Sequence, residues 1–439
     1  METIKKDGFN LVRQTDGPDL GYSPTSGVKI IEVDGKAFKS FDGSDTLLPY
    51  EDWRLPMEER AADLASRLSV DEIAGLMLYS IQNKLPMPND TYGGKPFAES
   101  SMKAYDLSDA QIKFLTDDNL RHVLVSTVES PETAARWNNK VQALIEGRTH
   151  GIPANNSSDP RHSAFADAEF SPGSDGSISL WSNMLGLAAT FSPETVEEFG
   201  RIAREEYRAL GLATALSPQA DLGTDPRWYR YSSTFGPEPR LVTDLTRAYA
   251  DGFQTDPTAG GWGNGSVNAM VKHWPGGGSG EGGRDAHYGN GKFAVYPGGC
   301  YEQHKIPFLE GAFKLTGGTK KASAVMPYYT ISYNQTDENV GNGFNREIIS
   351  HQLREEAGYD GVVCTDWGVL KDGDKTWGVE ALSQPERFEK MLEVGIDQIG
   401  GDFFTDDGNS GVALYAKDKG DDEALARVRD SARRVCTFM

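Results

Sequence analysis

A carboxylate beside a tryptophan, just after a short apolar run, is the clearest chemical feature of this sequence. The run Val362–Cys364 has no polar alternation, and Asp366 and Trp367 follow it after a single threonine. Such a run is typical of a parallel strand that is covered on both faces. In a (β/α)8 barrel, the carboxyl ends of the strands carry the catalytic groups. Asp366 could therefore be a nucleophile for a sugar ring stacked on the indole, or it could simply cap the next helix.

Several other segments have the same character and also run into polar side chains. Strand-like stretches are predicted at 122–128, 151–159, 212–218, 267–274, 322–328 and 395–401. The side chains at or just after their ends include Asp159, Arg230, Lys272, His273 and Tyr328. Helical patterns lie between these stretches, for example at 193–210 and 239–253. Strands that alternate with helices indicate a parallel α/β fold, and reactive groups at strand after strand favour a TIM-type barrel with one mouth.

The same residue types suit the hydrolysis of a glycoside. A retaining glycosidase needs a carboxylate nucleophile, a carboxylic acid, and polar groups that hold the hydroxyls of the sugar. Asp159 can accept hydrogen bonds from two neighbouring hydroxyls, while Arg230, Lys272 and His273 can donate to others. Lys272 and His273 could instead be a satisfied pair in the core.

The order of these motifs resembles that of glycoside hydrolase family 3. The resemblance covers residues 53–439 and is carried by Asp159-Pro-Arg161-His162, Asp225-Pro-Arg227-Trp228-Tyr229-Arg230, Lys272-His273-Trp274, Met326-Pro-Tyr328 and Thr365-Asp366-Trp367. The chain looks like the N-terminal barrel domain of a β-glucosidase-type member. The resemblance implies that Asp366 is the nucleophile and that Asp159, Arg230, Lys272, His273 and Tyr328 line the −1 subsite. Trp367 would offer a flat apolar face to the sugar.

The acid/base group is the open point of this interpretation. In two-domain members it is a glutamate from a second α/β domain, and the tail after Arg433 looks like the last barrel helix. Single-domain N-acetylglucosaminidases of the family use an Asp-x-His loop, and Asp285-Ala-His287 has that spacing. His287 is therefore a candidate acid/base, and Glu281 is a weaker one. Three functions stay open: a retaining exo-acting β-glucosidase completed by a second domain or chain, a β-N-acetylglucosaminidase using the loop pair, or a sugar-binding barrel without turnover of its own.

Composition narrows the class of partner. The chain has 439 residues, enough for one large barrel. Its 44 basic and 65 acidic side chains give a net charge of −21, which argues against nucleic acid and anionic membranes. No apolar run approaches the length of a membrane span, and the N-terminus has no apolar signal core, which suits a cytoplasmic protein or a secreted one without its signal. The three cysteines are widely spaced, so we expect no disulfide framework and no metal cluster. We expect no cofactor either.

The first 52 residues read differently from the rest. They are rich in glycine and contain a β pattern at Val28–Val33, so we expect an irregular arm with a short hairpin before a barrel at 53–439. Ser40–Glu51 has the outline of a calcium loop with an acidic twelfth position. Two of its ligand positions are serines, and Asp45 stands where the turn requires glycine, so a vestigial loop is the favoured interpretation. Ser69–Glu72 is a capping box that should restart the first barrel helix.

Overall fold

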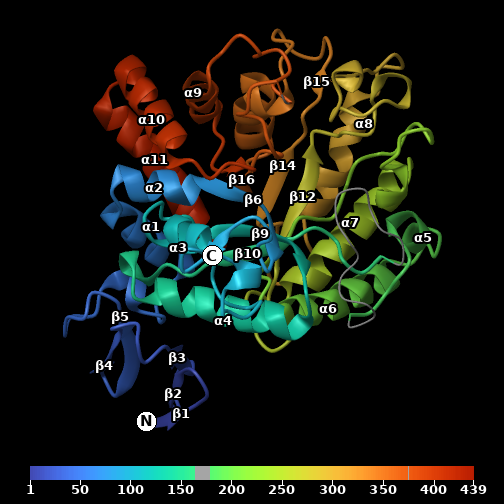
Figure 1. The fold of residues 1–439 in the computed structure, drawn as a ribbon. Helices are drawn as coiled ribbons and strands as arrows, with labels where there is room; N and C mark the ends of the chain where they lie inside the picture. Colours follow the sequence, from blue (N-terminus) through green and yellow to red (C-terminus); the bar gives the residue numbers. More distant parts are fainter. Residues whose placement is uncertain (164–177, 374) are drawn as a thin grey trace.

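Eight parallel strands form the centre of the molecule in the computed structural model, which describes residues 1–163, 178–373 and 375–439 (Figure 1). In order around the sheet they are β6 (Leu78–Leu85), β9 (His122–Val128), β10 (Asn155–Ser158), β11 (Thr214–Ala215), β12 (Asn268–Trp274), β14 (Ala324–Pro327), β16 (Val362–Val363) and β17 (Ile399–Gly400). A parallel bridge between Cys364 and Gln398 joins the two ends of the sheet. The predicted (β/α)8 barrel is thereby confirmed.

The strand β6 is the one barrel strand that the sequence did not reveal. It follows directly on helix α2 (Val70–Met77) without a turn residue, and its polar positions at Gln82 and Lys84 blur the apolar run. The other seven strands lie within or beside the predicted segments. Their carboxyl ends share one end of the barrel, because all eight strands are parallel.

Helices between the strands pack around the barrel. They are α1 (Met57–Arg67), α2, α3 (Asp109–Thr116), α4 (Pro131–Glu146), α5 (Met184–Ala188), α6 (Pro193–Leu210), α7 (Pro239–Gln254), α8 (Tyr301–Ile306), α9 (Gln384–Val394), α10 (Thr405–Lys419) and α11 (Asp421–Phe438), with π-helical segments at Pro307–Ala312 and Glu347–Glu356. The capping box is confirmed, since Ser69 accepts from the backbone of Glu72 and Glu72 accepts from the backbone of Ser69. None of the helices among the described residues is both long and apolar enough to cross a membrane.

The N-terminal arm is built from two small antiparallel sheets. The first joins β1 (Glu2–Lys5), β2 (Asn10–Arg13) and β3 (Leu20–Tyr22), and the second is the hairpin of β4 (Lys29–Val33) and β5 (Lys36–Ser40). The expected hairpin at Val28–Val33 is thus present. In Figure 1 the arm extends below the barrel at the lower left. The division of the chain at residue 52 stays a prediction.

The calcium-like loop after β5 is held by hydrogen bonds of its own. The Glu51 carboxylate accepts from the backbone N–H groups of Phe41 (2.7 Å) and Leu48 (3.0 Å), and Asp42 accepts from Ser40 and Ser44. These carboxylates therefore act as acceptors within the loop. Across the described ranges, no group of three or more His, Cys, Asp or Glu side chains is placed to hold a metal ion.

Two short strand pairs lie outside the barrel. One joins β7 (Thr91–Tyr92) to β8 (Lys95–Pro96), and the other joins β13 (Phe293–Ala294) to β15 (Ile331–Ser332) in parallel. The second pair matters for the site, because it ties the loop after β12 to the loop after β14. Both loops leave the carboxyl ends of their strands, so the pair helps to build the wall of the barrel mouth.

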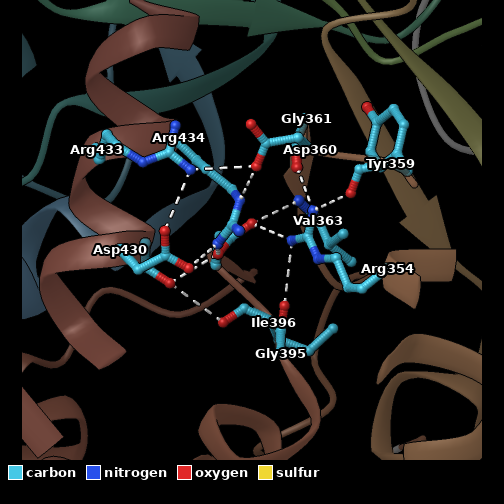
Figure 2. A network of polar contacts seen from close by, with 12 residues as sticks. Arg354, Tyr359, Asp360, Gly361, Val363, Gly395, Ile396, Asp430, Arg433 and Arg434 are labelled. Carbon is cyan, nitrogen blue, oxygen red and sulfur yellow. Dashed lines mark hydrogen bonds and ion pairs between the residues drawn. The ribbon is translucent and has the colours of Figure 1, made fainter. Parts of the chain in front are cut away.

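A network of arginines and aspartates lies at the opposite end of the barrel, beside the starts of β16 and β17 (Figure 2). Asp397, just before β17, is fully buried and accepts from Arg354 (2.5 Å), the Val363 backbone (3.0 Å) and Ser431 (2.7 Å). Arg427 and Arg434 of α11 lie 3.8 and 3.5 Å from its second oxygen. Figure 2 also shows Arg434 facing Asp360, at 3.0 Å, just before β16. These contacts tie α11 to the two strands at the seam of the barrel.

Candidate active site

The two carboxylate oxygens of Asp366 differ in their contacts: one accepts hydrogen bonds and the other does not. Its Oδ1 accepts from the Tyr329 hydroxyl at 2.7 Å and from the Trp367 backbone N–H at 2.8 Å. Its Oδ2 is buried, has no hydrogen-bond partner among the described residues, and lies 3.7 Å from His273 Nε2. Because one oxygen is fixed by two donors, the other has a defined direction, which is the arrangement that a carboxylate nucleophile requires.

Asp159 and Lys272 meet in a buried ion pair at the same mouth. The Lys272 ammonium lies 2.8 Å from Asp159 Oδ1, and the two side chains are only 7% and 10% exposed. Asp159 follows β10 directly, and the Tyr207 hydroxyl donates a hydrogen bond to the Asp159 backbone carbonyl at 2.7 Å. The structure thus brings together two of the residues predicted from the sequence, one from each of two strands that flank β11.

Lys272 and His273 are consecutive residues, yet both side chains lie at the mouth of the barrel. The pairing of β12 with β14 shifts register here: Lys272 faces Met326 and Trp274 faces Pro327, so His273 is the extra residue of a bulge. A bulge redirects the side chains around it, which explains how two neighbouring residues contribute to one site. The bulge is a property of the pairing with β14, so the sequence of β12 alone does not show it.

His273 is held by a buried aspartate that sequence analysis did not identify as a site residue. Its Nδ1 lies 2.7 Å from Asp221 Oδ2, and its backbone N–H donates to Asp221 Oδ1 at 3.1 Å. Burial lowers the pKa of His273, and the nearby Arg230 adds to this, although Asp221 opposes both. Burial would raise the pKa of Asp221, but His273 and the backbone N–H groups of His273 and Gly277 hold it below its ordinary value.

Arg230 and Gln219 extend the cluster on the β11 side. Arg230 is buried, and its guanidinium lies 3.4 Å from the amide oxygen of Gln219. Gln219 is bridged to Lys272 through the backbone, and its amide nitrogen is buried without a hydrogen-bond partner in the described parts of the chain. Gln219 was not predicted as a site residue. The sequence did carry a signal for it, because Gln219 is a polar residue directly after the predicted strand at 212–218.

Asp285 is the centre of a second polar cluster, and it gathers four donors. It accepts from the His287 backbone (2.9 Å), from His287 Nδ1 (2.5 Å), from the Trp228 indole (2.6 Å) and from the Tyr328 hydroxyl (2.7 Å). Burial would raise its pKa, but His287 and Trp228 lower it strongly. The Asp285–His287 pair that the spacing suggested is therefore formed, and the four donors favour the carboxylate form of Asp285.

The two consecutive tyrosines after β14 have different contacts. Tyr328 packs against His273 with ring centroids 4.3 Å apart, and its hydroxyl is directed to Asp285. Tyr329, which sequence analysis did not select, is the tyrosine that reaches Asp366. The rings of His287 and Tyr329 pack edge to face, with their centroids 4.8 Å apart. His287 is thus connected to the Asp366 carboxylate through one aromatic residue.

Trp367 is held beside Asp366 by contacts with β6, which lies on the far side of β17 from β16. Its indole N–H donates to the Ser80 carbonyl at 3.3 Å, and its ring packs edge-on against Tyr79 at 5.1 Å. A Cβ added at Gly400 or Gly401 would lie 2.6 or 2.8 Å from the indole. The double glycine at the end of β17 therefore provides the space for the ring, and a larger residue at either position would crowd it.

The fold and this site define a TIM-type barrel with a carboxylate-based mouth, and comparison with known proteins identifies its family. Residues 96–437 match the model of the glycosyl hydrolase family 3 N-terminal domain, and the chain belongs to this family. The resemblance seen in the sequence is confirmed. A periplasmic β-glucosidase/β-xylosidase of Dickeya chrysanthemi is 39% identical over 404 residues, which cover 86% of this chain and 58% of the relative.

Two solved structures show the same fold at lower identity. A β-glucosidase of Erythrobacter marinus superposes with a TM-score of 0.65 and 23% identity over 89% of this chain and 46% of its own. A β-N-acetylhexosaminidase of Beutenbergia cavernae superposes with a TM-score of 0.62 and 22% identity over 84% of this chain and 97% of its own. The chain spans between 54% and 58% of the length of the first four curated relatives it matches.

Proposed function

We propose that this chain is the catalytic barrel of a retaining, exo-acting β-glycosidase, with terminal β-D-glucosyl residues as its substrate. The observation that carries the proposal is the geometry of Asp366: Tyr329 and Trp367 hold Oδ1, while Oδ2 has no hydrogen-bond partner among the described residues and lies 3.7 Å from His273 Nε2. The β-glucosidase and β-xylosidase names of the curated relatives support the substrate class.

The reaction follows from this arrangement. Asp366 Oδ2 attacks the anomeric carbon, the bond to the leaving-group oxygen breaks, and a glycosyl–aspartate ester forms. The departing oxygen keeps the bonding electron pair and takes a proton from an acid. Water then attacks the same carbon, gives its proton to the conjugate base of that acid, and releases Asp366 as a carboxylate.

The sugar is held by the groups around Asp366. In this proposal the Asp159–Lys272 pair, Arg230, His273 and Gln219 bind its hydroxyls, and Trp367 supplies an apolar face. Lys272 and Asp159 are paired with one another, which pre-organises them and lowers the cost of ordering them when substrate binds. Tyr328 contributes indirectly, because its ring packs on His273 while its hydroxyl binds Asp285.

We further propose that the acid/base comes from a second α/β domain or a second chain that covers the mouth. Exposed aromatic residues support this: Tyr229, Tyr288, Tyr333 and Phe404 are 46%, 64%, 44% and 60% exposed. Each lies on a loop that leaves the carboxyl end of a barrel strand. Exposed apolar side chains around one opening are typical of a surface that a partner covers. The relatives' greater length agrees with this arrangement.

A second candidate is a β-N-acetylglucosaminidase that uses His287 as its acid/base. The contact that favours it is the 2.5 Å hydrogen bond between His287 Nδ1 and the ionised Asp285, next to Tyr329. The β-N-acetylhexosaminidase of Beutenbergia cavernae has a similar fold at nearly its full length. Substitution of His287 separates the two candidates. Under our proposal, His287→Ala slows aryl and alkyl glycosides alike. An acid at His287 instead predicts a far larger loss on alkyl glycosides and a vanished basic limb of the pH–rate profile.

The proposal is tested with p-nitrophenyl β-glucoside and the isolated chain. An aryl leaving group needs little protonation, so attack by Asp366 alone should release a burst of p-nitrophenol, followed by slow turnover. Cellobiose should be cleaved poorly by the same preparation. A chain that binds glucosides but releases no p-nitrophenol would be a sugar-binding barrel without turnover of its own.

A further inference from the structure

His273 and Asp221 form a buried pair behind the nucleophile. The Asp221 side chain is fully buried and the His273 side chain is 1% exposed. Asp221 comes from the segment that follows β11, and His273 lies at the bulge of β12. The Tyr328 ring covers one side of the imidazole at 4.3 Å between centroids. The orientation of the imidazole is therefore fixed by groups on three neighbouring strands or loops.

The hydrogen bonds of Asp221 determine which imidazole nitrogen carries the proton. Its Oδ1 accepts from two backbone N–H groups, those of His273 and Gly277. Its Oδ2 faces His273 Nδ1 at 2.7 Å. An ionised carboxylate can only accept, so Nδ1 must be the donor. Because burial favours the neutral imidazole, the second nitrogen, Nε2, then carries a lone pair and no proton.

Nε2 points at the nucleophile and has nothing to bind there. It is buried, has no hydrogen-bond partner among the described residues, and lies 3.7 Å from Asp366 Oδ2, which also has none. Two acceptors that face one another need a donor between or beside them. Lys272, Arg230 and the Gln219 amide nitrogen can only donate, so none of them can accept a hydrogen bond from a substrate hydroxyl. Asp159 can accept, but it is paired with Lys272, whereas His273 Nε2 is a neutral acceptor directly beside Asp366 Oδ2.

We propose that Asp221 is a positioning residue that keeps His273 as a hydrogen-bond acceptor, so that the site selects a sugar with a free donating hydroxyl at that point. This inference rests on the proposed function and adds a specificity rule to it. A sugar whose hydroxyl there is methylated or replaced by fluorine lacks the donor and leaves His273 Nε2 unpaired. The enzyme should cleave such an analogue with a lower kcat/KM than the parent sugar. In the complex with the analogue the buried His273 Nε2 has no hydrogen-bond donor, whereas in the complex with the parent sugar it has one.

The substitution Asp221→Asn tests the proposal by reversing the imidazole. The asparagine oxygen will occupy the position that accepts from the two backbone N–H groups, which places the amide NH2 against His273 Nδ1. Nδ1 must then accept, and the proton moves to Nε2. Nitrogen-15 spectra of histidine-labelled protein should show Nε2 unprotonated in the wild type and protonated in Asp221→Asn, with the signals assigned by their loss in His273→Gln. The value of kcat/KM on p-nitrophenyl β-glucoside should fall roughly 10²-fold.

A matched control is available in Asp251→Asn. Asp251 is a buried carboxylate of α7 that also accepts backbone N–H groups, those of Thr316 (3.0 Å) and Gly317 (2.9 Å), far from the mouth. This variant should leave the His273 spectrum and kcat/KM unchanged. A wild-type spectrum with the proton on Nε2 overturns the proposal even if Asp221→Asn does not fold, as does a reversed tautomer with unchanged kcat/KM. The spectrum is independent of turnover, so a wild type with the expected tautomer and no glucosidase activity would contradict the proposed function instead.

Discussion

The buried Lys272–Asp159 ion pair should contribute to stability and to activity in ways that substitutions can distinguish. The two side chains are 7% and 10% exposed and their charged atoms lie 2.8 Å apart. Removing one member of a buried pair leaves an uncompensated charge and costs about 3–5 kcal/mol of stability. We therefore expect Lys272→Met and Asp159→Leu each to lower the free energy of unfolding by about that amount. Urea denaturation at pH 7 measures it.

The double variant separates two contributions to the free energy of unfolding: the cost of leaving one charge buried without a partner, and the net stabilisation by the intact pair. Replacing a buried ion pair by apolar residues of similar volume is often neutral, so Lys272→Met with Asp159→Leu should recover most of the lost stability. Activity should not return, because both of the side chains proposed to bind the sugar are gone: kcat/KM should stay at least roughly 10²-fold below the wild type, a loss of about 3 kcal/mol in transition-state binding.

A surface pair provides the control for this cycle. Lys113 and Asp118 lie 2.6 Å apart with the lysine 62% exposed, so Lys113→Met should cost less than about 1 kcal/mol. Single variants at Lys272 and Asp159 that are as mild as this control would show that neither charge depends on its buried partner. Recovery of activity in the double variant would equally show that the pair does not bind substrate.

Three further predictions concern the barrel seam and the groups around Asp366. Asp397→Ala should cost about 3–5 kcal/mol in urea denaturation, against less than about 1 kcal/mol for the half-exposed Asp360→Ala. Burial would raise the pKa of Asp397, but the arginines around it hold that pKa below its ordinary value. The stability that Asp397 contributes should therefore be complete above about pH 4 and be lost as the pH falls further. A wild type whose stability falls no more steeply in this range than that of Asp397→Ala would contradict this. Tyr329→Phe removes a donor to Asp366 and should lower kcat roughly 10- to 10²-fold with little change in stability, whereas an unchanged kcat would show that the hydroxyl does not orient the nucleophile. Gly400→Ala would bring a Cβ within 2.6 Å of both the Trp367 ring and the Thr365 carbonyl, so it should shift both and cost about 1–3 kcal/mol, visible in urea denaturation and in tryptophan fluorescence.

The barrel was predictable because its strands are buried on both faces. Unbroken apolar runs such as Val362–Cys364 indicate such strands, and parallel strands necessarily share one end. Their positions along the sequence are therefore enough to predict that Asp159, Lys272 and Asp366 lie at one mouth. The same reasoning did not find β6, whose run contains Gln82 and Lys84 and lacks a turn before it. Its place beside β9 and β17 is visible only in the pairing.

The residues that sequence analysis did not select depend on side-chain direction. Tyr328 and Tyr329 are neighbours, and only the backbone course after β14 decides that Tyr329 reaches Asp366 while Tyr328 reaches Asp285. Asp221 becomes a site residue through the bulge that turns His273 toward it. Neither feature leaves a periodic pattern in the sequence. Both follow from contacts between strands that are distant along the chain.

Trapping the glycosyl–enzyme intermediate shows directly whether Asp366 is the nucleophile. Incubation with an activated 2-deoxy-2-fluoro-β-glucoside should slow the second step enough for the ester to accumulate. Peptide mass spectrometry is then expected to find one fluoroglucosyl group per chain, attached to Asp366, and none on Asp366→Asn. Label on any other carboxylate, or a wild-type chain that releases the aryl group without acquiring label, would contradict the account.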